Sequence, residues 1–505
     1  MITTTADHDA VLRPTSRDDV VRCVLQARAN GRPLYPISTG MNWGYGARAP
    51  VRAGSTLLDL SAMNRILNAD RISPAHPVAV IEPGVTQSQL HAHLRRHCPG
   101  LVFNVIGSAA ATSIVGNALD RGVGYAGPRR EDVFGLEFVA GTGQVLQTGF
   151  RRLGEDSPIA HCHPYGLGPM LDGLLFQGNC GVVTSACFKL APRPERQLAL
   201  AMAPHRGSDL AGFIDRLVEL RRERVMTAVT HIGNQARSQA SLLAGITRYL
   251  QLRCGLADAA LADEAAHALT LAAPHPWTGL GALAGSPRLV KAALAEVRAR
   301  LRGVASVRWF DEHRLARAQR LADGLRAWRP ARTRAAALAA LRPLHGLTAG
   351  TPSDAAVDNL LWRFGDGALQ AHRFDESDCG LLYVNPALPT DGRFVVDVLA
   401  GMEAIGHAHG QQLQMTLNIE TELSLVAVVN LLYARTDVRA ASLARRCAEA
   451  LHAYIRSRGL EVYRARTDMM AAVVKPDSDY WRTLRQLKAV FDPDNIIAPG
   501  RYSID

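Results

Sequence analysis

The pattern of apolar and polar residues divides the chain into two regions. Up to about residue 204, short apolar runs alternate with helical segments. Ser16, with Asp19 three residues later, is typical of a helix N-cap, and apolar residues then recur at helical spacing from Val20 to Ala27. Strand-like runs follow at 34–37, 56–60, 78–82 and 182–190, with a helix at 87–98 and a hairpin over 133–149. This order predicts a mixed α+β unit.

From about residue 205, long stretches rich in Ala, Leu and Arg replace the short runs. Segments 283–302 and 439–459 have the periodicity of amphipathic helices, and strand-like pieces intervene at 380–385 and 423–432. The glycine-rich stretch 279–285 is expected to be a turn, and the tail 491–501 is loop-like. The pattern therefore predicts a second α+β unit.

Composition narrows the class of protein. A chain of 505 residues predicts two or three domains. The net charge of +11 comes from scattered Lys and Arg rather than a basic tail, so we expect no nucleic-acid partner and at most a weak preference for anionic substrates. The eight cysteines are spread singly, and on the predicted helix His91 and His93, two residues apart, do not share a face, so we expect neither disulfides nor a metal. Residues 1–7 lack a signal-peptide pattern and no apolar run suits a membrane span, which predicts a cytoplasmic protein with no membrane partner.

A glycine-rich loop at 38–46 carries the first candidate chemistry. A strand followed by such a turn exposes successive backbone N–H groups that can bind a pyrophosphate, and glycines at 40, 44 and 46 permit close approach. The loop is not a P-loop, because no Gly-Lys-Ser/Thr sequence follows it. It is not a Rossmann fingerprint either, because the spacing of its glycines is wrong. Taken alone, it is more often just a turn.

Six blocks in order give the loop a context. They are Pro36–Gly46, Val80–Thr86, Gly116–Tyr125, Pro164–Pro169, Gln177–Thr184 and Pro493–Arg501. Together they resemble the vanillyl-alcohol oxidase and p-cresol methylhydroxylase family of FAD-dependent oxidoreductases, over nearly the whole chain. Six ordered blocks are far more specific than any single one.

The resemblance implies an α+β, two-domain PCMH-type FAD-binding fold. An FAD-binding domain would comprise 1–204, completed by 461–505, and a cap domain of 205–460 would cover the flavin and form the substrate pocket. The residues expected to bind FAD are Ile37, Ser38, Thr39, Gly40, Met41, Asn42, Tyr45, Gly46, Ser113, Asn117, Asp120, Gly124, Tyr125, Val183 and Arg501.

The resemblance also points to a substrate. In the phenol-oxidising members, two tyrosines and an arginine hold the substrate as a phenolate, and Tyr45, Tyr463 and Arg464 stand at the matching positions. An arginine and two phenolic donors around one oxygen stabilise its anion. A para-substituted phenolate makes hydride loss from the benzylic carbon to flavin N5 easier and gives a quinone methide. We therefore expect FAD-dependent oxidation of a para-substituted phenol or related aromatic alcohol, with O2 or an electron-accepting protein as oxidant, in a homodimer.

Two positions depart from the family pattern. The catalytic carboxylate of the family is replaced by Ser108, a candidate catalytic position that cannot accept a proton without its own base. Glu420 and Glu422 are the nearest candidate replacements, although surface glutamates would be the simpler interpretation. The covalent flavin link of this branch is replaced by Leu381, so we expect non-covalent FAD, with a thioether to Cys379 as a minor alternative.

Two other functions fit the same pattern. The loss of the carboxylate at Ser108 favours a same-fold oxidase or dehydrogenase of secondary metabolism acting on a different hydroxyl, amine or C–H substrate. A flavin-binding protein that has lost catalysis and serves as a partner is the alternative from another class.

Overall fold

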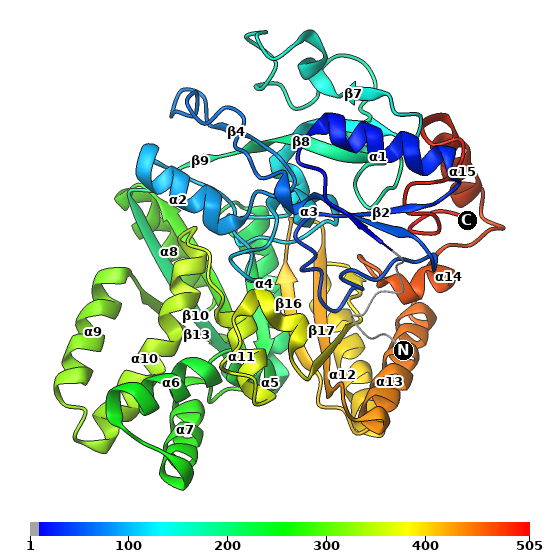
Figure 1. The fold of residues 1–505 in the computed structure, drawn as a ribbon. Coiled ribbons are helices and arrows are strands. Elements are labelled where there is room, and N and C mark those ends of the chain that lie inside the picture. Colours follow the sequence, from blue (N-terminus) through cyan, green and yellow to red (C-terminus); the bar gives the residue numbers. More distant parts are fainter. Residues whose placement is uncertain (1–9) are drawn as a thin grey trace.

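Two small sheets form the upper part of the molecule in Figure 1, where the blue and cyan segments lie. The computed structural model describes residues 10–505, so the expectation of no signal peptide, made on residues 1–7, falls outside it. β1 (Val11–Leu12), β3 (Thr56–Asp59) and β2 (Leu34–Ile37) form a parallel sheet, and β4 (Val78–Ile81), β8 (Gly181–Lys189), β6 (Val133–Ala140) and β7 (Val145–Gln147) an antiparallel one. A short pair, β5 (Leu101–Val102) and β9 (Ala191–Pro192), lies beside them. These strands confirm the predicted runs.

Helices close the two small sheets. α1 (Arg17–Ala29) begins where the sequence predicted, because the Ser16 Oγ accepts a hydrogen bond from the Asp19 N–H at 3.2 Å. Its apolar face packs Val20 and Val24 against Val139 and Val182 of the antiparallel sheet. α2 (Gln87–His97) and the short α3 (Ile114–Leu119) complete this part. The chain thus presents loop 38–46 and α3 toward the centre of the molecule.

A larger sheet follows, with strand order β13-β10-β12-β11-β16-β17-β14 and β15 paired to β17. All its pairs are antiparallel. The strands are β10 (Arg196–Pro204), β11 (Thr230–Asn234), β12 (Trp277–Gly285), β13 (Ala305–Phe310), β14 (Cys379–Tyr383), β15 (Ala387–Leu388), β16 (Gln414–Ile419) and β17 (Leu425–Ala434). Because β10 belongs to this sheet, we propose that the cap domain begins near residue 196 rather than 205; the other predicted boundaries stay predictions.

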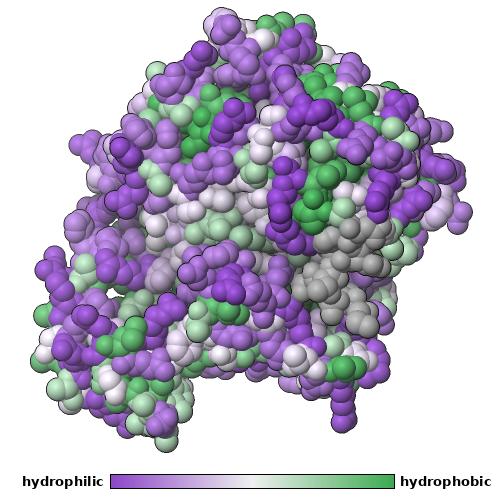
Figure 2. All heavy atoms as spheres, in the orientation of Figure 1, coloured by the Kyte–Doolittle hydropathy of each residue, from purple (hydrophilic) through white to green (hydrophobic). Residues whose placement is uncertain are grey.

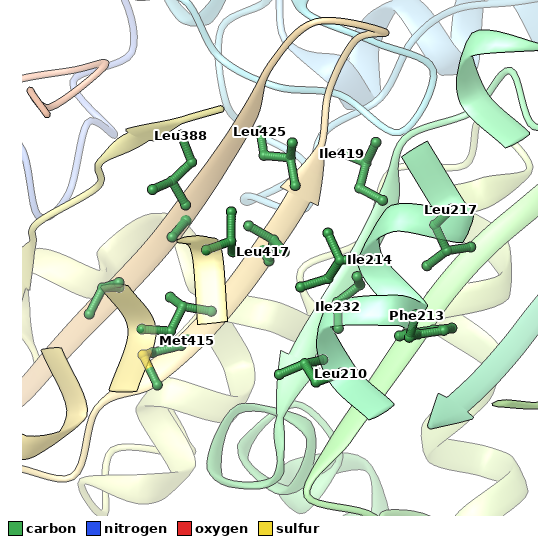
Figure 3. Packing of buried hydrophobic residues seen from close by; sticks show 14 of the residues in the cluster. Leu210, Phe213, Ile214, Leu217, Ile232, Leu388, Met415, Leu417, Ile419 and Leu425 are labelled. Atoms are coloured by element: carbon green, nitrogen blue, oxygen red, sulfur yellow. The ribbon is translucent and has the colours of Figure 1, made fainter. Parts of the chain in front are cut away.

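One face of the large sheet carries the main hydrophobic core. It is covered by α4 (Leu210–Arg222), α8 (Pro287–Arg300), α12 (Gly392–Ala408) and α13 (Val438–Ser457). Figure 3 shows Leu210, Phe213 and Ile214 of α4 beside Ile232 of the sheet. Alternate residues of each strand must therefore point to the opposite face.

A group of helices extends from the large sheet at the lower left of Figure 1. It comprises α5 (Gln235–Ala240), α6 (Leu243–Cys254), α7 (Asp258–Ala272), α9 (Glu312–Gly324), α10 (Arg329–Thr348) and α11 (Ala355–Arg363). Alanines and leucines of α6, α7 and α10 form a separate small core. On the face shown in Figure 2, apolar atoms gather in several small areas among polar ones rather than in one continuous field.

The expectation of a turn at 279–285 is wrong, because this segment lies within β12. Its glycines serve packing: a Cβ on Gly279 would lie 3.1 Å from the Phe213 ring, and one on Gly281 would lie 2.6 Å from the Met226 methyl. The predicted helix at 283–302 accordingly begins later, as α8 at Pro287. Across residues 10–505, no helix combines the length and the apolar character that a membrane crossing requires.

Candidate active site

A cleft with about 1120 Å³ of empty volume, including the part open to solvent, lies between loop 36–42, α3, segment 177–183 and the C-terminal tail. It is lined by most residues that the sequence assigned to the cofactor, and by Arg464. These cofactor residues are Ile37, Ser38, Thr39, Gly40, Met41, Asn42, Ser113, Asn117, Asp120, Val183 and Arg501. The structure thus brings together residues that are far apart along the chain.

Short contacts fix the glycine-rich loop against α3. The Ser113 N–H donates to the Thr39 Oγ1 at 3.1 Å, and the Ser113 Oγ donates to the Pro83 carbonyl at 2.6 Å. Gly116 allows this approach, because a Cβ there would lie 3.1 Å from the Ser38 Cβ and closer still to its hydroxyl. Gly40 has a φ of +71°, which turns the loop in a way that a side chain would resist. The two glycines therefore allow the loop and α3 to pack closely along one side of the cleft.

The C-terminal tail closes another side. After α15 (Asp479–Phe491), the tail runs beside β2, where the Leu34 N–H donates to the Ile496 carbonyl and the Ala498 N–H donates to the Leu34 carbonyl, each at 2.7 Å. The buried Lys488 ammonium donates to the Asp492 carboxylate at 2.6 Å and to the carbonyls of Asn179 and Ile497 at 2.9 Å. This anchoring positions Arg501 at the cleft.

The Asp120 carboxylate binds two arginines at the cleft. The Arg464 Nε donates to Asp120 at 2.6 Å, and the Arg501 Nη2 donates to the other oxygen of Asp120 at 3.2 Å. Asn42 donates to Asp120 at 2.8 Å and accepts from Arg464. Burial works to lower the pKa of Arg464, but Asp120 and the nearby tyrosines outweigh it and raise that pKa. Two arginines share one carboxylate, so this wall of the cleft keeps a net positive charge.

Two tyrosines adjoin Arg464. The Arg464 guanidinium lies 4.0 Å from the centre of the Tyr45 ring, whose hydroxyl accepts a hydrogen bond from the Asn385 amide. Burial raises the pKa of Tyr45 well above its usual value, and the neighbouring Tyr463 adds to the effect. Burial also raises the pKa of Tyr463, although Arg464 acts in the opposite direction. Both phenols therefore stay protonated near neutral pH and can donate a hydrogen bond.

A second cleft is lined by Tyr463 and Glu420, and it shares residues 177–179 with the first. Glu420 is 9% exposed, and its Oε1 has no hydrogen-bond partner within the described part of the chain. Burial, followed by the charge of Glu131, raises the pKa of Glu420 to about 7. Glu420 and Tyr463 both line this cleft, and the negative charge of Glu420 helps to raise the pKa of Tyr463.

The other predicted residues lie outside the first cleft. Tyr125 packs its ring against His231 at 4.6 Å, and a Cβ on Gly124 would collide with Asn104. Gly46 allows close packing against Thr467. The roles of Tyr45, Gly46, Gly124 and Tyr125 in cofactor binding stay predictions.

The structure shows what surrounds Ser108 and Leu381, the two positions that depart from the family pattern. The Ser108 Oγ lies 3.0 Å from the Thr112 Oγ1, and no base contacts it among residues 10–505. Leu381 lies beside loop 38–46, since a Cβ on Gly44 would be 3.0 Å from its Cγ. Cys379 is 1% exposed, and burial raises the pKa of its thiol to about 12. Neither side chain is suited to form a flavin bond.

Comparisons with known proteins identify the family. A family profile described as "FAD binding domain" matches residues 8–149. The chain is 30% identical over 525 aligned residues to a 1'-carboxy-chondrochloren decarboxylase of Chondromyces crocatus, covering 98% of this chain and 90% of that protein. It is 26% identical over 500 residues to the 4-cresol dehydrogenase [hydroxylating] flavoprotein subunit of Pseudomonas putida, covering 98% and 88%. Among solved structures, a 4-ethylphenol oxidase from Gulosibacter chungangensis in complex with isoeugenol superposes with a TM-score of 0.80 at 22% identity, covering 99% and 92% of the two chains.

A substrate-bound p-cresol methylhydroxylase gives a TM-score of 0.79 at 24% identity and covers 98% of this chain and 88% of that one. The chain belongs to the vanillyl-alcohol oxidase and p-cresol methylhydroxylase family. It is an FAD-dependent oxidoreductase, and the predicted fold class and cofactor are confirmed.

The cleft fits the cofactor of this family. Loop 36–42 and the N-terminal half of α3 line it, and Arg464 and Arg501 supply positive charge. The buried Asn117 Oδ1, also on the cleft, has no hydrogen-bond partner among the described residues. An unpaired buried oxygen is costly, so a donor on the cofactor would satisfy it.

Sequence analysis did not identify several residues that adjoin the site. Asn385 positions Tyr45 and also accepts the Val429 N–H at 2.9 Å, and Tyr383 stacks on Tyr45 with ring centroids 4.7 Å apart. The only signal for Asn385 was a polar residue ending a strand just before Pro386. In the described part of the chain, no three His, Cys, Asp or Glu side chains converge as metal ligands would.

Proposed function

We propose that this oxidoreductase oxidises a para-substituted phenol, or a related aromatic alcohol, at the benzylic carbon. The main support for this proposal is the cluster of Arg464, Tyr45 and Tyr463 at the edge of the FAD cleft. A cation beside two protonated phenols is complementary to one phenolate oxygen. The phenol-acting proteins of the same family support this assignment.

In this proposal each residue has a distinct task. Arg464, fixed by Asp120, favours the ionised phenol electrostatically, and Tyr45 and Tyr463 donate to its oxygen. Asn385 orients the Tyr45 hydroxyl. Bound FAD supplies the oxidising power, because it accepts a hydride from the substrate. The negative charge left on the ring oxygen strengthens release of that hydride from the benzylic carbon.

A proton acceptor is needed if water adds to the quinone methide or if a hydroxyl is oxidised. Ser108 has no base beside it, whereas Glu420 is buried near Tyr463 with an unpaired oxygen and a pKa of about 7. A carboxylate with such a pKa exchanges protons near neutrality. We therefore assign the proton-accepting task to Glu420.

A second candidate is oxidation coupled to loss of CO2, because the decarboxylase of Chondromyces crocatus matches nearly the whole chain. The benzylic carbon would lose a hydride to FAD, and the bond from the neighbouring carbon to its carboxylate would break. The electron pair of that bond forms the new double bond, and CO2 leaves. A product lighter than the substrate by CO2 and two hydrogen atoms would establish this course by mass spectrometry.

The electron acceptor and assembly are also proposals. The matching 4-cresol dehydrogenase is named as a flavoprotein subunit, so it belongs to a larger assembly. We propose either O2 or an electron-accepting protein for this chain, acting with a homodimer.

Substitution of Arg464 tests the phenolate site. Arg464→Ala should weaken binding of 4-alkylphenols by about 2–4 kcal/mol, because a buried charge partner is removed. Tyr45→Phe and Tyr463→Phe should each cost about 1–2 kcal/mol. Titration of the flavin absorbance with 4-ethylphenol measures the affinity, and anaerobic bleaching measures turnover.

The exposed Arg482→Ala is the control for the loss of one positive charge. Unchanged affinity in Arg464→Ala would refute the phenol assignment. It would favour a different hydroxyl, amine or C–H substrate.

A further inference from the structure

The face of the large sheet opposite the main core carries a polar strip. In β16, Met415, Leu417 and Ile419 belong to the core, so Gln414, Thr416 and Asn418 lie on the opposite face. In β11, Ile232 belongs to the core, which places His231 and Gly233 on the same face as the strip. The strand register pairs His231 with Asn418, Gly233 with Thr416, and Gln414 with Asn430 of β17.

This face turns toward the FAD-binding part of the chain. The ring of Tyr125 lies 4.6 Å from that of His231, and the Val229 N–H donates to the Tyr125 carbonyl at 2.9 Å. In β14, Tyr383 pairs with Asn430 of β17, and the Tyr383 ring stacks on that of Tyr45. The polar strip is therefore continuous with the substrate site.

The strip holds buried polar atoms without partners. Gln414 is 1% exposed, and among residues 10–505 neither its Nε2 nor its Oε1 has a hydrogen bond. The Asn430 Oδ1 and the His231 Nε2 are buried and unpaired in the same sense. Each such group costs about 1–3 kcal/mol unless something else satisfies it. Their position on one face indicates a polar ligand that is bound there.

Arg237 supplies the charge of this strip. It is partly buried on α5, and its aliphatic stem lies over Gly233, where a Cβ would be 3.6 Å from the Arg237 Cγ. Its positive charge acts on Tyr125, His231 and Tyr383, which belong to three other segments. Across the described chain, its guanidinium makes no ion pair and no hydrogen bond, unlike Arg464, which Asp120 neutralises. A partly buried arginine without a counter-ion is suited to bind an anion.

The geometry points to a substrate carboxylate at Arg237. This proposal rests on the phenolate site proposed above and extends it: the substrate is a 4-hydroxyphenyl acid, held by Arg464 at the phenolate and by Arg237 at the carboxylate of the side chain. Tyr383, whose ring stacks on Tyr45, lies within electrostatic reach of both arginines. A planar carboxylate suits a single guanidinium fork, and the Gln414 amide can contribute a further donor.

Three ligands separate the two anion sites. They are 3-(4-hydroxyphenyl)propanoate, which has both anionic groups, 4-propylphenol, which lacks the carboxylate, and 3-phenylpropanoate, which lacks the hydroxyl. Affinities are measured by isothermal titration calorimetry with the FAD-loaded protein. The wild type should bind the first ligand at least about tenfold more tightly than 4-propylphenol, as expected for a charged hydrogen bond.

Variants assign this preference to one side chain. Arg237→Gln should weaken both acids by about ten- to a hundredfold and leave 4-propylphenol unchanged, whereas Arg237→Lys should lose less. Arg253→Gln, an exposed arginine at the end of α6, is the control for the change in net charge.

Each outcome decides one proposal. If the acids and 4-propylphenol bind equally in the wild type, or if Arg237→Gln leaves acid binding intact, the carboxylate site is refuted while the phenolate site stands. If 3-phenylpropanoate binds through Arg237 but 4-propylphenol neither binds nor bleaches the flavin, the carboxylate site stands and the phenol assignment fails.

Discussion

At the scale of single residues, Asp120 determines how the site can act. It binds Arg464 and Arg501 with separate oxygens, so neither arginine can turn away from the cleft without losing a charged hydrogen bond. Arg464 is thereby held over the Tyr45 ring. A pre-positioned charge of this kind stabilises an anion without reorganising, which is the main way that proteins lower reaction barriers.

Ser108 is predicted to be dispensable. Its hydroxyl contacts Thr112 and has no base beside it, so it cannot accept a proton at neutral pH. Ser108→Ala should therefore keep most of the kcat/KM on the native substrate, whereas Ser108→Asp should raise or broaden activity on 4-hydroxybenzylic alcohols. Steady-state kinetics compares the three proteins. A loss greater than about a hundredfold in Ser108→Ala would show that the serine itself carries chemistry.

Glu420 is predicted to control the pH dependence of turnover. Burial raises its pKa to about 7, and only the ionised form accepts a proton, so kcat/KM should rise with pH through about 7. Glu420→Gln should remove this rise and lower the plateau by about a hundredfold. A pH profile of kcat/KM for both proteins, with Glu422→Gln as the control, checks the assignment; an unchanged profile in Glu420→Gln would exclude it.

The same group should affect stability in the opposite sense. Because the folded state keeps the proton of Glu420 up to about pH 7 and the unfolded state releases it near 4.5, stability should fall as the pH rises between these values. Urea unfolding at pH 5 and pH 8 measures this, and Glu420→Gln should reduce the difference.

The sequence indicated candidate site residues where a resemblance to the family could be recognised, as at Tyr463 and Arg464. Asn42, Asp120 and Arg501 could be assigned because each lies in a short ordered block. Arg237 and His231 could not, because nothing local distinguishes an unpaired arginine from a solvated one. Only the pairing of β11 with β16, and its contact with Tyr125, makes their position meaningful.

At the scale of elements, the chain was easiest to predict where local rules act. The cap of α1 and the short apolar runs of β2, β4 and β8 can be recognised from neighbouring residues, and the structure confirms them. β12 was missed because Gly279, Gly281 and Gly285 are typical of turns, whereas here packing against Phe213 and Met226 accounts for Gly279 and Gly281.

The tail that follows α15 depends on one buried ion pair. Lys488 is 3% exposed, and its three partners include the Asp492 carboxylate, which also accepts the Ile496 and Ile497 N–H groups. Lys488→Leu should lower the free energy of unfolding by about 3–5 kcal/mol, because it leaves a buried carboxylate without its cation. It should also weaken FAD binding, since the tail carries Arg501.

Thermal unfolding and FAD titration test the role of Lys488. The exposed Lys475→Leu is the matched control and should change neither quantity. Equal stability of the two variants would show that the buried pair does not hold the tail.

At the scale of the whole molecule, FAD is predicted to bind without a covalent bond. Leu381 has no nucleophile, and burial raises the pKa of the Cys379 thiol to about 12, so the thiolate is scarce. Acid precipitation should therefore release the yellow colour into the supernatant. Colour that stays with the pellet would mean a covalent link, and mass spectrometry of its peptides would locate it.

The pairing of the tail with β2 has a consequence for how the protein is made. Leu34 meets Ile496 and Ala498, so one wall of the cleft joins a strand with residues that are synthesised hundreds of positions later. A growing chain cannot assemble this wall until residue 501 is available. Contacts between such distant positions also close slowly, since a long loop must be ordered first. Cofactor capture should therefore be a late event, reached only by chains whose synthesis has passed the tail.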